Sequence, residues 1–123
     1  MTKFRPVDPK STYSYNSSMN YPDREIVIDT GGHTLNLDKR EYCAPEGKPK
    51  RLTPLETSIL SVLMVNSPDV LSRSDIMYCA GMSEDVYEQA VTAHIFNIRR
   101  KIRPSAPIRS IEGVGYAFHV NPS

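Results

Sequence analysis

The sequence predicts one α+β domain with an antiparallel sheet, three helices and a terminal β-hairpin. Short β-type runs alternate with turn residues over positions 25–52, and apolar residues recur at helical spacing over 53–103. Two more β-type runs, at 108–111 and 116–120, flank a glycine turn and predict the hairpin. A chain of 123 residues has room for one such domain with a modest core.

The first 23 residues differ in composition from the rest of the chain. They combine prolines with Ser, Thr, Tyr and Asn and contain little aliphatic material, so they lack the apolar surface needed to order themselves. We therefore predict a flexible tail over residues 1–23 and a folded domain over residues 24–123. The tyrosines of the tail leave docking on a partner open as an alternative to a solvated tail.

Four short strands are predicted at the start of the domain. Residues 25–29 and 33–37 flank the turn Thr30-Gly31-Gly32, and this pattern is typical of a hairpin. Residues 41–44 and 50–52 are two further candidates, joined across a segment rich in turn residues. Together these strands predict a small antiparallel sheet.

The first helix has strong boundary signals. Thr53 suits the N-cap, Pro54 the first helical position, and Glu56 the closing of a capping box. The helix should end before Pro68, because the residue ahead of a proline resists helical angles. One side of it carries apolar residues for the core, namely Leu55, Ile59, Val62 and Leu63.

Two further helices follow the first. Ser72 with Asp75 predicts the start of a short second helix, and Gly81 predicts its C-terminal cap. A third helix should begin at Ser83 and continue to Pro104, over about residues 84–103.

The third helix carries two different faces. At 3.6 residues per turn, one narrow stripe is apolar and consists of Val91, Ile95, Ile98 and Ile102. The opposite side carries Gln89, Ala93, Phe96, Asn97 and Arg100. Four cations lie in the last turns with no carboxylate among them, namely Arg99, Arg100, Lys101 and Arg103. Since the net charge of the chain is only +1, this positive charge is local, and phosphate is its natural target.

Four short sequence segments occur at defined places in this order of predicted elements. They are Leu-Thr-Pro-Leu-Glu at 52–56, Val-Thr-Ala-His-Ile at 91–95, Ile-Arg-Arg-Lys-Ile at 98–102 and Gly-Val-Gly-Tyr at 113–116. In sequence and spacing they resemble the winged-helix DNA-binding domain of the OmpR/PhoB class of bacterial response regulators. The resemblance implies a winged helix-turn-helix fold whose third helix enters the major groove of DNA. The hairpin at 108–120 would be the wing, beside the neighbouring minor groove.

The resemblance also implies which side chains meet the bases. The outward face of the third helix would supply Ala93, Phe96 and Asn97, with Arg100 close by. An Asn side chain can bond adenine N6 and N7 together, and an aromatic ring can rest on a thymine methyl group.

Other side chains would meet phosphates and fix register rather than sequence. On the flanks of the helix these are His94, Arg99 and Arg103. The family typically has Arg where this chain has Glu112 at the wing and Gln89 in the helix. We expect either that the wing stays off the DNA or that Arg109 compensates from its strand. A solvated basic helix end is the alternative interpretation.

The predicted function is therefore sequence-specific transcriptional regulation. Double-stranded DNA is the expected partner, in the cytoplasm with the nucleoid. Three alternatives stay open for the pairing of two copies without a receiver domain: a dimer formed by another route, cooperative contacts on DNA, or a chain that is part of a longer protein. No receiver domain fits within the first 23 residues, which predicts a stand-alone regulator. The alternative is a winged helix that binds protein and modulates RNA polymerase or another regulator through the loop 80–84 and Phe96. The low net charge, Glu112 and Gln89 motivate it.

Several other classes of function are not expected. His94 has no nucleophile beside it in sequence and no carboxylate to orient it, so catalysis is not predicted. Cys43 and Cys79 fall in separate elements without metal-ligand spacing, which predicts reduced thiols and no metal site or cofactor. The sequence contains neither a membrane-spanning apolar run nor the apolar core of a signal peptide.

Overall fold

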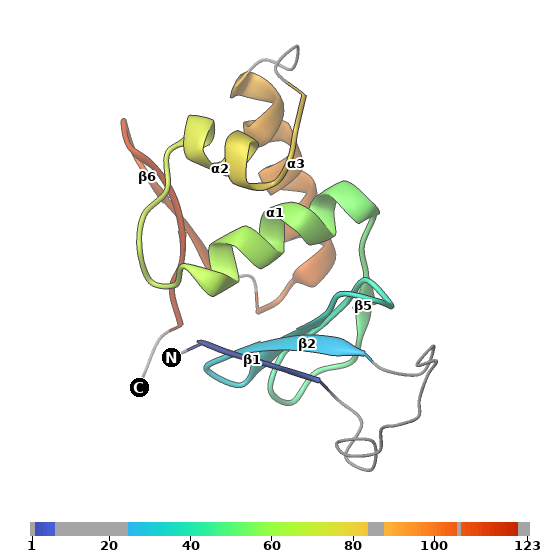
Figure 1. The fold of residues 1–123 in the computed structure, drawn as a ribbon. Coiled ribbons are helices and arrows are strands. Elements are labelled where there is room, and N and C mark those ends of the chain that lie inside the picture. Colours follow the sequence, from blue (N-terminus) through green and yellow to red (C-terminus); the bar gives the residue numbers. More distant parts are fainter. Residues whose placement is uncertain (1, 7–24, 84–87, 106, 121–123) are drawn as a thin grey trace.

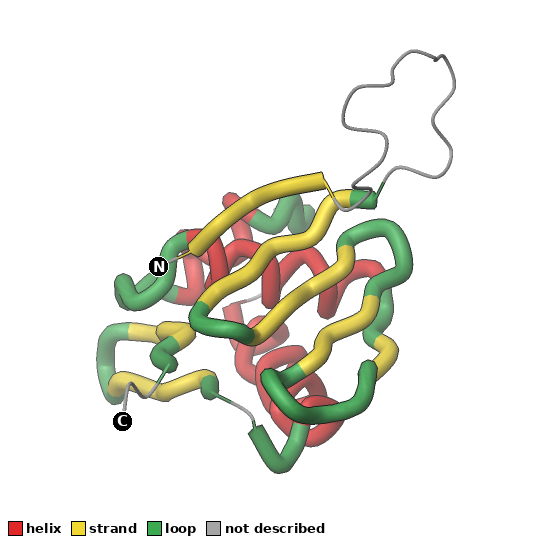
Figure 2. Tube along the Cα trace, turned by 90° about the horizontal axis from the view of Figure 1, so that it is seen from below, coloured by secondary structure: helices red, strands yellow, loops and turns green. Residues whose placement is uncertain are grey.

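Three helices lie on one side of an antiparallel sheet, with the first and third in contact with its strands and the second packed on the other two, and a two-stranded hairpin lies beside the helices (Figure 1). A computed structural model of the chain describes residues 2–6, 25–83, 88–105 and 107–120. Seen from the sheet side, the strands lie in front of the helices (Figure 2). The sheet consists of β1 (Thr2–Pro6), β2 (Ile26–Thr30), β3 (His33–Asn36), β4 (Glu41–Cys43) and β5 (Lys50–Arg51), each paired with the next.

The four strands predicted from sequence are confirmed to within one residue at each end. Their register brings Ile28 opposite Leu35 and Leu35 opposite Tyr42. All three side chains are buried against the helices, because alternate residues of a strand face the same side. The sheet therefore supplies one wall of the core.

The first strand corrects the predicted tail. Thr2–Pro6 pairs antiparallel with β2, from Thr2 opposite Thr30 to Pro6 opposite Ile26. The prediction of a flexible segment over 1–23 is thus wrong for residues 2–6. It was based on side-chain composition, whereas an edge strand is held by backbone hydrogen bonds to a partner that composition does not reveal. Residues 7–24, with the tyrosines proposed to dock, lie outside the described residues.

The start of α1 (Pro54–Val65) confirms the predicted capping box. Thr53 Oγ1 accepts a hydrogen bond from the Glu56 backbone N–H at 3.1 Å, and Glu56 Oε1 accepts one from the Thr53 N–H at 3.0 Å. The helix ends at Val65, with Asn66 as its cap.

The buried side of α1 is wider than predicted. Ile59 and Leu63 are buried as expected, but Leu60 and Met64 are fully buried as well, while Val62 is only half-buried. The reason is that α1 contacts the sheet, both other helices and β7. A helix packed on two sides buries more than one stripe.

Helix α2 (Arg73–Cys79) begins at the predicted cap, with Ser72 Oγ accepting from the Asp75 N–H at 3.0 Å. At its other end Ala80 is the cap and Gly81 follows it with φ +74°. The Gly81 N–H donates to the Tyr78 carbonyl, and the Met82 N–H donates to the Met77 carbonyl. This pair of bonds is the Schellman motif, in which a left-handed residue is usually glycine.

Helix α3 (Glu88–Ile102) buries its predicted stripe completely. Val91, Ile95, Ile98 and Ile102 are each at most 1% exposed. The predicted start of this helix at Ser83 depends on residues 84–87, which lie outside the described residues. The apolar stripe therefore fixes which side of α3 is turned outward.

The hairpin consists of β6 (Ile108–Ile111) and β7 (Gly115–Phe118). Ile108 and Phe118 anchor it in the core. Leu71, in the segment between α1 and α2, forms a bridge to Tyr116 with two backbone hydrogen bonds of 2.8 and 2.9 Å. A Cβ on Gly115 would overlap the Leu71 carbonyl oxygen, so this close approach requires glycine.

Candidate nucleic-acid interface

The outward face of α3 presents the side chains predicted from sequence. Ala93, Phe96 and Arg100 are exposed and Asn97 is half-buried. Phe96 is 63% exposed, a large value for a phenylalanine in a helix that buries four other apolar residues. The core therefore does not account for the position of Phe96.

Three of these side chains form a connected group. Arg100 Nη2 donates to Asn97 Oδ1 at 3.1 Å. The Arg100 guanidinium carbon also lies 5.8 Å from the centre of the Phe96 ring, within cation–π range. Arg100 thus restrains both neighbours, and the surface presents a carboxamide, an aromatic ring and a cation side by side.

The four cations at the C-terminal end of α3, three within the helix and Arg103 directly after it, do not all face solvent as free charges. Arg100 and Arg103 are exposed, whereas Arg99 and Lys101 are half-buried and bound to other parts of the protein. His94 is half-buried on the flank of the helix. The positive field available to phosphate is consequently smaller than the sequence alone indicates.

Lys101 is bound to α1. Its Nζ lies 2.8 Å from Glu56 Oε1, and the Glu56 side chain is only 6% exposed. Burial by itself raises the pKa of the Glu56 carboxyl, but the Lys101 ammonium and the hydrogen bonds with Thr53 outweigh it, so the pKa lies below its ordinary value. The same carboxylate closes the capping box of α1 and holds the last turn of α3.

Arg99 is bound to the wing. Its Nη2 donates to the Ile108 carbonyl and to Ser110 Oγ, both at 2.8 Å. Its guanidinium carbon lies 5.8 Å from the centre of the Tyr116 ring. Arg103 is exposed, and its carbonyl oxygen accepts from Lys50 Nζ at 3.3 Å.

The wing carries charges of both signs. Glu112, Gly113 and Val114 are exposed at its tip, and Arg109 is exposed on β6. Because strand residues alternate between faces, Arg109 projects from the side opposite Ser110, which faces α3. Arg109 is therefore accessible at the outer side of the wing, as its predicted role requires.

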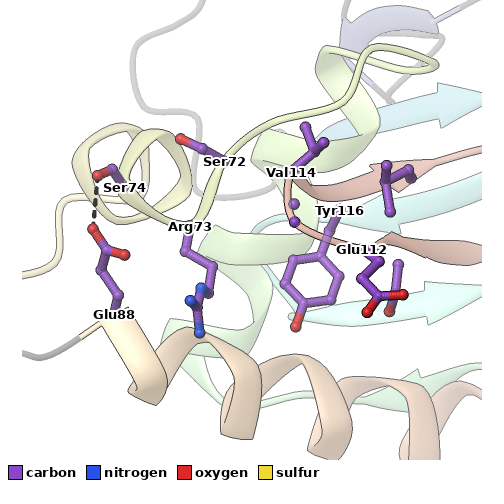
Figure 3. A pocket seen from close by; sticks show the side chains of 11 residues that line it. Ser72, Arg73, Ser74, Glu88, Glu112, Val114 and Tyr116 are labelled. Atoms are coloured by element: carbon purple, nitrogen blue, oxygen red, sulfur yellow. Dashed lines mark hydrogen bonds between the residues drawn. The ribbon is translucent and has the colours of Figure 1, made fainter.

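A pocket of about 350 Å³ opens between the starts of α2 and α3 and the wing (Figure 3). Glu88 and Glu112 line it, together with Arg73 and Tyr116. Ser74 Oγ donates to Glu88 Oε2 at 3.0 Å across its mouth. With two carboxylates and one guanidinium, the pocket is not a strongly positive cleft.

Arg73 is a cation that sequence reasoning missed. Its Nη1 donates to Thr92 Oγ1 on α3 at 3.3 Å, and its side chain points toward α3 in Figure 3. One signal was present in the sequence: a cation at the first position of a helix is disfavoured by the helix dipole. The hydrogen bond to Thr92 is the contact that Arg73 makes in return.

Comparison with known proteins decides the family. The model of the family described as "Transcriptional regulatory protein, C terminal" matches residues 47–118. The chain belongs to this family. It is an OmpR/PhoB-type winged-helix domain, as the resemblance in the sequence implied, and this family is a class of regulator domains rather than a class of enzymes.

Relatives of this winged-helix domain are longer regulators. Regulatory protein VirG of Rhizobium rhizogenes is 33% identical over 90 residues, covering 69% of this chain and 37% of that protein. Transcriptional regulatory protein QseB of Haemophilus influenzae is 35% identical over 99 residues, covering 80% and 44%. The chain thus spans less than half the length of the curated relatives it matches.

Solved structures confirm the winged-helix fold. The C-terminal domain of the nisin resistance regulator NsrR has a TM-score of 0.64 and 25% identity, covering 74% of this chain and 95% of that chain. The DNA-binding domain of CpxR from E. coli has a TM-score of 0.61 and 24% identity, covering 76% and 95%.

The described residues were also compared with what a membrane span or a metal site requires. Within the described residues, no helix is both long enough and apolar enough to cross a membrane. Over the same part of the chain, no group of three His, Cys, Asp or Glu side chains is arranged to hold a metal ion. Cys43 and Cys79 are both free.

Proposed function

We propose that this chain regulates transcription by binding specific sites on double-stranded DNA, with α3 in the major groove and the β6–β7 hairpin as the wing. One observation carries the proposal. The apolar stripe of α3 is fully buried, so the helix holds Ala93, Phe96, Asn97 and Arg100 outward as one surface of base-contacting chemistry. An α-helix with such a face fits the major groove of B-DNA.

Each outward side chain has a specific role in this proposal. The Asn97 carboxamide bonds adenine N6 and N7, and the Phe96 ring packs on a thymine methyl group. Ala93 allows the helix to approach the bases closely. Arg100 supplies charge next to both groups and orients Asn97 through the hydrogen bond to its Oδ1.

Phosphate contacts come from the edges of this surface. Arg103 at the end of α3 and Arg109 on the wing are exposed cations, and His94 lies on the flank of the helix. Arg73 adds a cation at the start of α2. Such contacts fix the register of the protein on DNA and make its affinity depend on salt.

The test begins with selection of bound fragments from random double-stranded DNA. On the selected site, Asn97→Ala should relax preference at one base pair, where a good bidentate contact is worth about 1–3 kcal/mol of discrimination. Arg100→Ala should weaken binding to all sites.

Lys39→Ala is the matched control, because it removes one exposed cation from the turn between β3 and β4 and should leave the selected site and its affinity unchanged. Equal affinity of the wild type and Arg100→Ala for DNA would overturn the proposal.

The arrangement of selected sites tests pairing on DNA. We propose that two copies bind together, because one helix in one groove contacts only a short half-site. A direct repeat would indicate copies aligned head to tail, and an inverted repeat would indicate a two-fold dimer. Binding of chromosomal sites would place the protein with the nucleoid.

A second candidate function is favoured by exposed aromatic rings. Tyr78 on α2 is 86% exposed and Phe96 is 63% exposed, and large exposed apolar groups are typical of protein contacts. These residues and the loop after α2 would bind RNA polymerase or another regulator. The protein would then shift no DNA at low salt, yet retain a polymerase subunit or a regulator in a pull-down that Tyr78→Ala abolishes.

A further inference from the structure

The wing of this protein is attached to α3 through polar side chains as well as through the core. Arg99 Nη2 donates two hydrogen bonds of 2.8 Å to β6, one to the Ile108 carbonyl and one to Ser110 Oγ. The Arg99 guanidinium also lies over the Tyr116 ring of β7. A single side chain of α3 therefore holds both strands of the wing.

A second group of contacts joins the wing to α3 and α3 to α2. Tyr116 Oη donates to Thr92 Oγ1 at 3.2 Å, and the same oxygen accepts from Arg73 Nη1 at 3.3 Å. Figure 3 shows the Arg73 and Tyr116 side chains extending from α2 and β7 toward α3. Thr92 thus lies at the junction of α2, α3 and the wing.

These contacts help to orient the β6–β7 hairpin, which by itself is only marginally stable. Two strands of four residues are marginally stable by themselves, and the wing tip at residues 112–114 is exposed. Ile108 and Phe118 anchor the end of the hairpin opposite the tip, and the backbone bridge between Leu71 and Tyr116 holds β7 to the segment before α2. The Arg99 bond to the Ile108 carbonyl lies at the anchored end. Its bond to Ser110 Oγ and its contact with the Tyr116 ring lie nearer the tip and join the wing to α3 itself.

We propose that Arg99 is a positioning residue that fixes the wing to α3, so that one binding event places the wing at the minor groove beside the major groove that α3 occupies. This inference rests on the function proposed above. Arg99 acts here through Ile108, Ser110 and Tyr116 rather than by contacting a phosphate itself. Arg109, on the outer side of the wing, reaches DNA only when the angle between the wing and α3 is held.

The test compares hydroxyl-radical footprints on the selected DNA site. Wild-type protein should protect the backbone on both sides of α3 and the minor groove under the wing. At concentrations that saturate the α3 zone, Arg99→Gln should lose the protection under the wing and keep the protection around α3. Its dissociation constant should rise about tenfold, which corresponds to ~1.4 kcal/mol of binding lost with the wing contacts.

Two further variants separate positioning from charge and from folding. Arg103→Gln removes the same charge from the residue that directly follows α3, and it should weaken binding while keeping protection under the wing. Thr92→Val changes no charge and removes the hydroxyl oxygen that accepts hydrogen bonds from Tyr116 and Arg73. It should therefore reduce the protection of DNA under the wing, as Arg99→Gln does. The thermal midpoint of each free variant shows whether it is folded.

The outcomes distinguish this inference from the function on which it rests. Wild-type protein that shows no protection under the wing overturns the inference, as does unchanged wing protection in Arg99→Gln and Thr92→Val. If Arg99→Gln loses protection equally around α3 and under the wing, Arg99 contacts phosphate directly, and the inference is overturned as well. Wild-type protein that binds no DNA at all would remove the proposed function itself.

Discussion

Phe96 is the residue whose exposure most directly indicates contact with a base. The four apolar residues on the opposite side of α3 are buried, whereas Phe96 is 63% exposed and lies beside Arg100. In the major groove, thymine is the base that offers a methyl group to such a ring. The account therefore assigns one thymine in the binding site to Phe96.

Replacing thymine by deoxyuridine tests this assignment, because it removes only the methyl group. Scanned across the selected site, one such replacement should weaken wild-type binding about fourfold, corresponding to the ~0.8 kcal/mol of one buried methyl group. The Phe96→Ala variant should bind both DNAs equally well in a fluorescence titration.

Val114→Ala provides the control for this titration, since it removes exposed apolar surface from the wing tip and should retain the sensitivity of the wild type. If wild-type protein tolerates deoxyuridine at every position, or if Phe96→Ala still discriminates, Phe96 does not contact a thymine methyl.

Other residues of α3 show where sequence reasoning reaches its limit. The buried stripe followed from helical spacing, which is a local property. The partners of Arg99 and Lys101 did not, because Ile108 and Ser110 follow in a later element and Glu56 lies 45 positions earlier. A run of cations reveals charge, but only tertiary structure reveals which charges are already bound.

At the scale of elements, the contact between α1 and α3 holds α3 in position. Glu56 caps α1 and accepts a hydrogen bond from Lys101 in the last turn of α3. The native pKa of Glu56 lies below its ordinary value, which is about 4.3 in an unfolded chain. The stabilisation is therefore complete above that unfolded value and is lost as the pH falls through the lower native pKa.

The variant Glu56→Gln measures this contribution. At pH 7 it should lower the free energy of unfolding by about 1–2 kcal/mol, because it removes a charged acceptor from the buried pair and weakens the cap. At pH 3 the difference from wild type should be smaller, since part of the wild-type carboxyl is then protonated and no longer stabilises the fold as an ion. Urea unfolding at both pH values gives the comparison, and a difference that stays constant or grows at pH 3 would contradict the shift.

Element boundaries were predictable to different degrees. Capping residues such as Thr53 and Ser72 placed the starts of α1 and α2, because these signals act within one helical turn. The strand Thr2–Pro6 was missed, because its partner β2 begins 20 positions later than β1 ends. The burial of Leu60 and Met64 was missed for a similar reason, since it depends on α1 packing between the sheet and the other helices.

At the scale of the whole molecule, the sheet, the helices and the wing contribute different contacts to the fold. The sheet packs Ile28, Leu35 and Tyr42 against the helices and completes the core that orients α3. The wing is joined to the segment between α1 and α2 through Leu71 and to α3 through Arg99. The winged-helix architecture was predicted because the order of these elements, with the four segments at 52–56, 91–95, 98–102 and 113–116, resembles that of the family. The angle of the wing depends on side-chain contacts and was not predictable.

The central claim is that the outward face of α3 contacts nucleotides. Titration of the isotope-labelled protein with its selected DNA, followed by amide chemical shifts, tests it most directly. The largest changes should occur at Ala93, Phe96, Asn97 and Arg100, with smaller changes at the wing and none in the β3–β4 turn. Changes confined to the sheet or to α1, with the α3 amides unaltered at saturation, would show that this face does not contact nucleotides.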